Sequence, residues 1–187
     1  EHLISPCDGL LSLFPIDENS LFHIKQSHYR VADLVQDANL AARFQGGVCM
    51  IFRLCPQHYH HYCYIDDGYQ GENHFIPGSL HSVQPIACET YPVYVQNRRS
   101  WCLVETDHFG PVIWTEIGAM IVGGIVNHWE NTRIRRGLEK GHFDLCGSTI
   151  VLLFQKDQVR LLPELAQGLE SQPEVPVTYG MQIGRKA

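Results

Sequence analysis

The sequence predicts a mainly β, α+β fold in which a β core is accompanied by a few short helices. Most of the chain consists of short apolar or alternating runs separated by Gly, Pro, Asn and Asp, which is typical of strands joined by turns. Only two stretches have helical spacing of apolar residues. With 187 residues and 44% hydrophobic content, the chain can bury one good core, which indicates one compact domain over residues 1–187 or two closely packed lobes.

The strand predictions follow the period of the apolar residues. A half-buried strand alternates apolar and polar side chains, whereas a strand buried on both faces is a continuous apolar run between turn residues. Runs of these two kinds predict strands at residues 10–16, 48–54, 62–65, 92–95, 100–105, 112–117 and 150–154.

Two helices are predicted. Residues 32–44 carry alanine, leucine and valine on one face at helical spacing. Residues 163–169 begin with Pro163, whose fixed φ suits the first turn of a helix. After a turn-like stretch at residues 171–176, residues 177–183 predict a closing strand that ends at Gly184.

Charge and composition exclude several classes of protein. The formal net charge is −6 and the longest basic run, residues 133–136, is short, so we expect no nucleic-acid binding and no electrostatic attraction to an anionic bilayer. The longest apolar stretches, residues 117–126 and 150–154, are too short to cross a bilayer. The seven scattered cysteines indicate reduced thiols in a cytosolic compartment. Because the chain begins at Glu1, we expect a trimmed amino terminus without targeting information.

The most informative segment is the sequence Gly147-Ser148-Thr149, which stands directly before the apolar run of residues 150–154. Glycine and serine cluster wherever a chain reverses, so this segment alone is typical of a turn before a strand. Other stretches of the chain change that interpretation. They are residues 5–9 (Ser-Pro-Cys-Asp-Gly), 22–26 (Phe-His-Ile-Lys-Gln), 44–47 (Phe-Gln-Gly-Gly), 54–63 (Leu-Cys-Pro-Gln-His-Tyr-His-His-Tyr-Cys), 77–85, 117–125 and 136–143.

This ordered set resembles the motifs of the phosphatidylserine decarboxylase family over nearly the whole chain, in register. The resemblance implies a barrel-sandwich-like β core and a self-processing pyruvoyl enzyme. The hydroxyl of Ser148 attacks the carbonyl of Gly147, and the resulting ester eliminates to leave a β chain of residues 1–147 and an α chain of residues 148–187. Glycine before the serine lets the backbone bend far enough for this attack.

The cofactor implied by the resemblance is a pyruvoyl group made from Ser148. Its ketone condenses with a substrate amine, and the imine accepts the electrons that remain when carbon dioxide departs. Neither pyridoxal phosphate nor a metal is then required.

The family's processing triad of aspartate, histidine and serine carries over at two positions, Asp8 and Ser148. When the Tyr-His of the family motif is matched to Tyr59 and His60, Cys63 stands at the second histidine of the motif. In the same match, His61 occupies the position of the arginine in the family motif. A histidine oriented by a carboxylate is a good base near neutral pH, whereas a thiol has an unperturbed pKa of about 8.5. We expect His61 or Cys63 to take over the base role.

His60 matches the family histidine associated with decarboxylation. The resemblance implies that it protonates the substrate-derived carbanion or holds the carboxylate, although a lone histidine is more often structural. His58 replaces the aspartate of the motif and is expected to be a surface or strand-packing residue. At residues 96–99 (Gln-Asn-Arg-Arg), the sequence lacks the acidic residue of the family's Asn-Glu-Arg, so a local ion pair is not expected.

Two other classes of function stay open. A zinc-binding module would draw its ligands from Cys55, His58, His60, His61 and Cys63. In a strand, His58 and His60 share one face and His61 and Cys63 share the other, so the five cannot converge without a break in the strand, and none of them is assigned as a metal ligand. The second class is an unprocessed homologue that acts as a scaffold or regulator, which the departures at Cys63 and Arg98 favour.

The resemblance implies that the substrate is phosphatidylserine, which is decarboxylated to phosphatidylethanolamine through a Schiff base. It also implies a cytoplasmic protein with peripheral contact at the inner face of a membrane. Decarboxylation of a soluble amino acid uses the same imine chemistry and is the alternative. A homo-oligomer is compatible with both.

Overall fold

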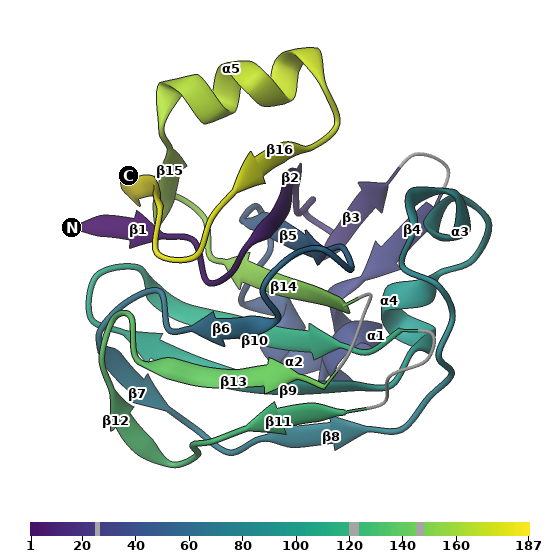
Figure 1. Ribbon diagram of the computed structural model, residues 1–187, viewed down its shortest axis with the longest axis horizontal. Helices are drawn as coiled ribbons and strands as arrows, with labels where there is room; N and C mark the ends of the chain where they lie inside the picture. The colour runs from purple at the N-terminus through teal and green to yellow at the C-terminus, as the bar shows by residue number, and fades with distance from the viewer. Residues whose placement is uncertain (25–26, 120–123, 145–147) are drawn as a thin grey trace.

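The computed structural model describes residues 1–24, 27–119, 124–144 and 148–187, which form the mainly β, α+β fold that the sequence predicts (Figure 1). The largest sheet is open rather than closed into a barrel. Its strands lie in the order β12 (Thr132–Ile134), β7 (Gly68–Gln70), β9 (Arg99–Thr106), β10 (Gly110–Ile117), β14 (Ser148–Phe154), β5 (Val48–Leu54), β2 (Gly9–Pro15) and β16 (Val175–Val177), and β8 (His74–Ile76) also pairs with β9.

Three smaller sheets surround the large one. The first is formed by β1 (His2–Ile4), β17 (Gln182–Lys186) and β15 (Val159–Leu161), and it brings the two ends of the chain side by side (Figure 1). The second consists of β11 (Ile125–Asn127), β13 (Glu139–Phe143) and β6 (His61–Cys63). The third is a hairpin of β3 (Leu21–Ile24) and β4 (Ser27–Arg30).

Five short helices lie in the described ranges: α1 (Val31–Val35), α2 (Ala38–Ala42), α3 (Pro85–Thr90), α4 (Val93–Gln96) and α5 (Pro163–Ser171). None of these helices is long and apolar enough to span a bilayer. The six cysteines within the same ranges are free thiols, as the sequence predicts.

Strand β14 lies at the centre of the core. All of its residues are buried, and it pairs with β5 on one side and β10 on the other. Ile150 and Leu152 face one apolar cluster, whereas Val151 and Leu153 face a second cluster that the helices α1, α2 and α4 cover. The continuous apolar run at residues 150–154 is therefore explained by burial of the strand on both faces.

A buried ion pair joins the sheet of β6, β11 and β13 to the large sheet. The Nζ of Lys140 on β13 contacts Oε1 of Glu116 on β10, and both side chains are fully buried. Lys140 also donates to Oδ1 of Asn127 at 2.7 Å and lies over the ring of Trp114 at 5.5 Å. Two opposite charges with these extra contacts can be buried together because each satisfies the other.

Three of the predicted elements are wrong in detail. The apolar run 92–95 is part of helix α4, which starts after Pro92 and buries Val93 and Tyr94. A short apolar run does not distinguish a buried strand from a buried helix. The predicted helix 32–44 is two helices, because Gln36 adopts a left-handed φ of 57° and the Asp37 side chain caps α2 by accepting from the amide of Leu40 at 2.9 Å.

The predicted closing strand 177–183 is also wrong, because two strands, β16 and β17, flank a turn there. Gly180 in this turn has a φ of 76°, a conformation that favours glycine. Gly184 lies inside β17 instead of ending it. The turn carries Tyr179 to the amino-terminal segment, where the amide of Gly180 donates to the carbonyl of Ser5 at 3.0 Å.

Candidate functional site

Ser148 is the first residue of β14, opposite Leu54 of β5. Its side chain is 1% exposed, and its Oγ has no hydrogen-bond partner among the described residues. A buried hydroxyl without a partner costs about 1–3 kcal/mol, so such groups in a folded protein call for a functional explanation. Gly147 lies outside the described residues, and with it the geometry of the Gly147–Ser148 bond.

His60 lies against the strand that leads toward Ser148. Its carbonyl accepts a hydrogen bond at 3.0 Å from the amide of Phe143, the last residue of β13. Burial lowers the pKa of His60, partly offset by the nearby Cys55 backbone, and neither ring nitrogen has a well-formed hydrogen bond within the described part of the chain. The ring is therefore neutral near pH 7, with a nitrogen lone pair free to accept a proton.

Asp8 and Cys63 are linked through Tyr179, a residue that the sequence did not single out. The Asp8 carboxylate accepts from the amide of Tyr179 at 2.8 Å, and the Tyr179 hydroxyl contacts the Cys63 thiol. Burial raises the pKa of Cys63 to about 11, and the contact with Tyr179 offsets this only in part. At neutral pH the thiol is protonated, which makes it a weak base.

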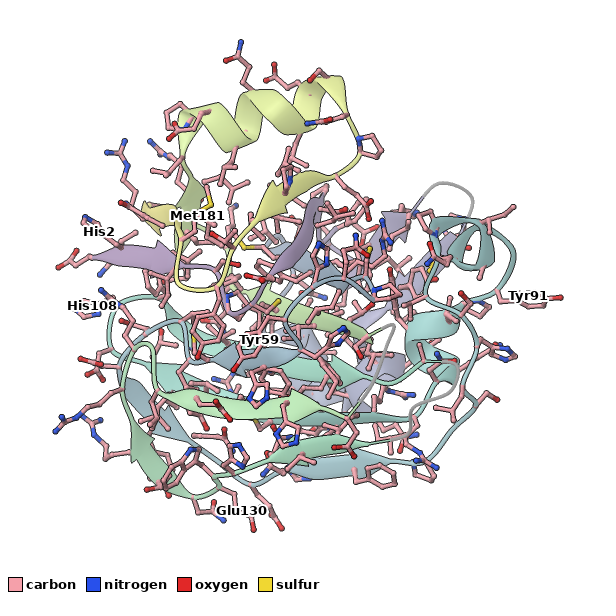
Figure 2. All side chains as sticks on the ribbon, in the orientation of Figure 1. His2, Tyr59, Tyr91, His108, Glu130 and Met181 are labelled. Atoms are coloured by element: carbon pink, nitrogen blue, oxygen red, sulfur yellow. The ribbon has the colours of Figure 1, made fainter. Side chains whose placement is uncertain are left out.

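His61 lies on the outward face of β6 in a cluster of ionisable side chains. Its Nδ1 is 3.0 Å from Oε1 of Glu139, and the Nε2 of His128 is 2.9 Å from the same oxygen. The two histidines lower the pKa of Glu139, chiefly through the hydrogen bond from His128. The ring of His61 stacks on His142 at 4.8 Å and on Tyr59 at 4.7 Å, and Tyr59 lies at the centre of Figure 2.

A β-bulge explains why sequence reasoning missed this cluster. In a regular strand, Glu139 and His142 would point to opposite faces, because they are three residues apart. The pairing of β13 with β6 shifts by one residue between Glu139 and Gly141, so Lys140 is extra and points inward. Both Glu139 and His142 then share the face of His61.

The five side chains weighed as a zinc set are not brought together. The Cys55 amide donates to Nδ1 of His58 at 2.9 Å, which closes a local turn, and the Cys55 sulfur accepts from Arg53 at 3.1 Å. His61 faces Glu139, as described above, and the Cys63 sulfur points toward the carbonyl of Ser5 at 4.0 Å. His58 thus has a structural role within a turn, whereas the sequence predicts a surface or strand-packing residue.

The Asn-x-Arg part of residues 96–99 is structural. The Asn97 side chain donates to the carbonyls of His81 at 2.7 Å and Gly118 at 2.8 Å. The buried Arg99 guanidinium donates to four backbone carbonyls, two of which belong to α1. Backbone carbonyls rather than a carboxylate therefore satisfy this arginine.

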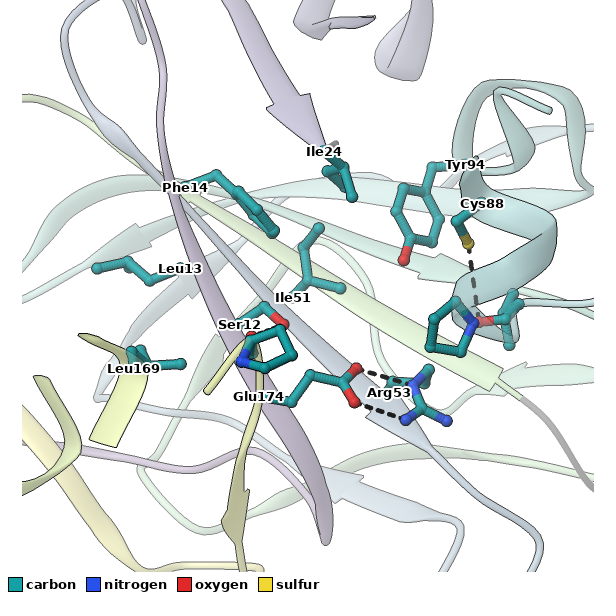
Figure 3. Close-up of a pocket in the computed structure, with 13 residues that line it drawn as sticks. Ser12, Leu13, Phe14, Ile24, Ile51, Arg53, Cys88, Tyr94, Leu169 and Glu174 are labelled. Atoms are coloured by element: carbon teal, nitrogen blue, oxygen red, sulfur yellow. Dashed lines mark hydrogen bonds and ion pairs between the residues drawn. The ribbon is translucent and has the colours of Figure 1, made fainter. Parts of the chain in front are cut away.

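A pocket of about 260 Å³ opens beside β2 and β5 (Figure 3). Much of its wall is apolar, and the residues that line it are Ser12, Leu13, Phe14, Ile24, Ile51, Arg53, Val83, Pro85, Cys88, Tyr94, Leu169, Pro173 and Glu174. Arg53 forms a bidentate ion pair with Glu174, at 2.9 and 2.6 Å. The described lining does not include Ser148 or His60, but Arg53 pairs across the sheet with Thr149, which follows Ser148.

Comparison with known proteins first gives the class, which is a family that is named after a decarboxylase. A family model described as phosphatidylserine decarboxylase matches residues 1–185, so the chain belongs to the phosphatidylserine decarboxylase family. The resemblance seen in the sequence motifs is confirmed.

Curated relatives agree with this assignment. The chain is 40% identical over 183 residues to phosphatidylserine decarboxylase proenzyme 2 of Clostridium acetobutylicum, covering 98% of this chain and 62% of the relative. It is 35% identical over 186 residues to a phosphatidylserine decarboxylase proenzyme of Clostridium botulinum, with coverages of 98% and 63%. For the proenzyme of Clostridium perfringens the identity is 37% over 187 residues, with coverages of 98% and 64%. The chain thus spans less than two thirds of the length of these relatives.

Proposed function

We propose that this chain is the catalytic domain, residues 1–187, of a self-processing phosphatidylserine decarboxylase. It cleaves itself between Gly147 and Ser148, and residue 148 becomes the pyruvoyl group that forms a Schiff base with the substrate. The observation that carries this proposal is the buried Ser148 hydroxyl at the head of β14, which has no partner in the described structure. The relatives are named proenzymes, which agrees with a chain that is made in an inactive form.

His60 is the proposed acid or base of decarboxylation. Its low pKa, caused mainly by burial, keeps the ring neutral before substrate arrives. A neutral imidazole can hold the substrate carboxylate through a hydrogen bond from its N–H. Once it has taken a proton from the substrate ammonium group or from solvent, it can donate that proton to the carbanion. Asp8 is the proposed orienting carboxylate, which acts through the turn that carries Tyr179.

His61 is the stronger of the two candidates for the base in self-cleavage. A carboxylate oxygen of Glu139 lies 3.0 Å from its Nδ1, and a carboxylate in this position can orient an imidazole for proton transfer. The buried Cys63, with a pKa of about 11, is almost entirely protonated at neutral pH. We propose His61 for this role, with Cys63 as the alternative. The pH dependence of the cleavage rate distinguishes the two.

The pocket supports a lipid substrate over a soluble amino acid. Its wall is mainly apolar, which suits an acyl chain, and its polar end at Arg53 is adjacent across the sheet to the start of β14. Nearby on the surface, Ile86 in α3 is 76% exposed, and Tyr91 projects outward at the edge of the molecule (Figure 2). Exposed apolar side chains beside an apolar pocket favour peripheral contact with a membrane. A homo-oligomer stays a prediction, which light scattering can check.

The first test is the intact mass of freshly purified protein beside a Ser148→Ala variant. We expect two fragments from the unmodified chain, divided between residues 147 and 148, with a carboxy-terminal fragment blocked by a carbonyl that borohydride reduces. The Ser148→Ala variant is expected to stay whole, because it lacks the attacking hydroxyl. Ser171→Ala, at an exposed serine in α5, is the matched control and should cleave normally.

A single uncleaved chain under all conditions would favour the scaffold or regulator class instead. For the cleaved protein, release of carbon dioxide from phosphatidylserine vesicles is then compared with release from free serine. Activity on vesicles alone supports the lipid substrate, and activity on serine alone supports the soluble amino-acid decarboxylase.

A further inference from the structure

We propose that His61, Glu139 and His142 form a binding site for a borderline divalent transition metal of the zinc class. One ring nitrogen from each histidine and one carboxylate oxygen lie within 4.8 Å of one another. Two imidazoles and one carboxylate are a ligand set that Zn²⁺ accepts, with a fourth position left for water. This set differs from the five residues that the sequence offered for a metal, since it shares only His61 with them.

The fold holds the three ligands in place before any metal arrives. His61 and His142 are direct partners across the antiparallel pair β6–β13, a position that places Cβ atoms about 4.5–5.5 Å apart. The β-bulge brings Glu139 to the same face, as described above. Each ligand therefore comes from a paired strand rather than from a loop, which keeps the ordering cost of binding small. For tetrahedral Zn²⁺ the donor atoms must close to about 3.3 Å, which side-chain rotation can supply.

Unpartnered nitrogen atoms give a second, independent reason. The Nδ1 atoms of His61 and His142 are both buried and make no well-formed hydrogen bond within the described structure. For His61 the nearby Glu139 oxygen is at ion-pair distance but outside hydrogen-bond alignment. Leaving such atoms unsatisfied costs free energy, and a metal ion that accepts their lone pairs would recover it.

The surroundings suit a bound cation. The side chains of His61, Glu139 and His142 are 35%, 39% and 27% exposed, so an ion can reach them without unfolding of the sheet. His128 donates to the Glu139 carboxylate at 2.9 Å and fixes its orientation, as the supporting residues of metal sites do. The carboxylate of Glu139 also supplies negative charge, which imidazole ligands do not bring to a metal ion.

The test is calorimetric titration of the full chain, without a histidine tag and stripped of metal, with Zn²⁺. It is done in the Ser148→Ala background, so that failure of self-cleavage and failure of metal binding are distinguishable. We expect one equivalent to bind, and His142→Ala and Glu139→Gln each to weaken binding by about 10- to 100-fold or more. His74→Ala removes an exposed histidine on β8 that stacks on Trp101 and is not one of the three ligands, and it should bind as the parent does. Mg²⁺ and Ca²⁺, which prefer oxygen ligands, should not compete.

Circular dichroism confirms that each variant is folded before titration. Absence of zinc binding in the parent protein would overturn the proposal, and so would unchanged affinity in folded His142→Ala. Equal weakening by His74→Ala would also overturn it, because it would indicate scattered surface binding.

Discussion

At the scale of single residues, burial decides which groups can transfer protons. It lowers the pKa of His60 and raises that of Cys63 to about 11, so both are neutral near pH 7. The consequence differs between them, because a neutral imidazole has a free lone pair whereas a neutral thiol is a poor acceptor. This contrast supports the proposal that a neighbouring histidine, rather than Cys63, is the base in self-cleavage.

We predict that Cys63→Ala matures within about twofold of the unmodified rate. A thiol with a pKa of about 11 is ionised in only about one molecule in 10⁴ at pH 7, so its removal takes away little base strength. The half-time of cleavage, followed by intact mass after synthesis in a cell-free system, measures this.

The pH profile distinguishes the two bases. A base acts when deprotonated, so a Cys63 thiolate would make the cleavage rate rise about tenfold per pH unit from pH 7 to 10, below its pKa of about 11. If such a rise occurs and Cys63→Ala abolishes it, the assignment of His61 is wrong. His61→Ala is expected to slow maturation by at least about 100-fold.

At the scale of the elements, the sheet of β6, β11 and β13 depends on a buried charge pair. Lys140 and Glu116 join it to β10, and no solvent reaches either side chain. The same sheet holds His60 and His61 close to β13, the strand that leads toward Ser148. The Lys140–Glu116 ion pair therefore stabilises the position of the proposed site.

We predict that Lys140→Met destabilises the protein by about 3–5 kcal/mol, because it leaves the Glu116 carboxylate buried without its partner. The double variant Lys140→Met/Glu116→Gln removes both charges and should recover most of that loss. Urea unfolding followed by fluorescence measures both. If the single variant lost less than about 1 kcal/mol of unfolding free energy, a change of about fivefold in the ratio of folded to unfolded protein, the prediction would be contradicted.

The same elements show what the sequence could predict. The sequence predicts the strand at residues 48–54 with its observed bounds, because an apolar run interrupted only by Arg53 indicates burial on both faces. The run 92–95 was predicted wrongly, because four residues are too few for the spacing of apolar side chains to distinguish a helix from a strand. Ser148, His60 and Asp8 came from motifs, but Glu139 and His142 depend on a bulge, and strand register cannot be derived from local sequence.

At the scale of the whole molecule, the proposed cleavage point lies between two parts that the fold interweaves. Residues 148–187 contribute β14 to the centre of the large sheet and β16 to its edge next to β2. They also contribute β17, which pairs with β1 at the beginning of the chain. Neither fragment could bury its apolar surface without the other.

We predict that the two fragments remain associated after cleavage. Every residue of β14 pairs with β5, and most also pair with β10, so separation would expose the core. Size-exclusion chromatography should give a single peak at the mass of the whole chain, with both fragments detected by mass spectrometry. Elution of separate fragments in the absence of denaturant would contradict this prediction.

The position of Ser148 at the head of β14 has a mechanical consequence. A new chain end ordinarily frays, because terminal residues have few contacts to hold them. Here the end created by cleavage would pair with β5, and every residue of β14 after it pairs with both β5 and β10, so a reactive ketone there would be fixed to a rigid support. Breaking the backbone at this point would separate the reactive group from the preceding residue and leave its position and orientation unchanged.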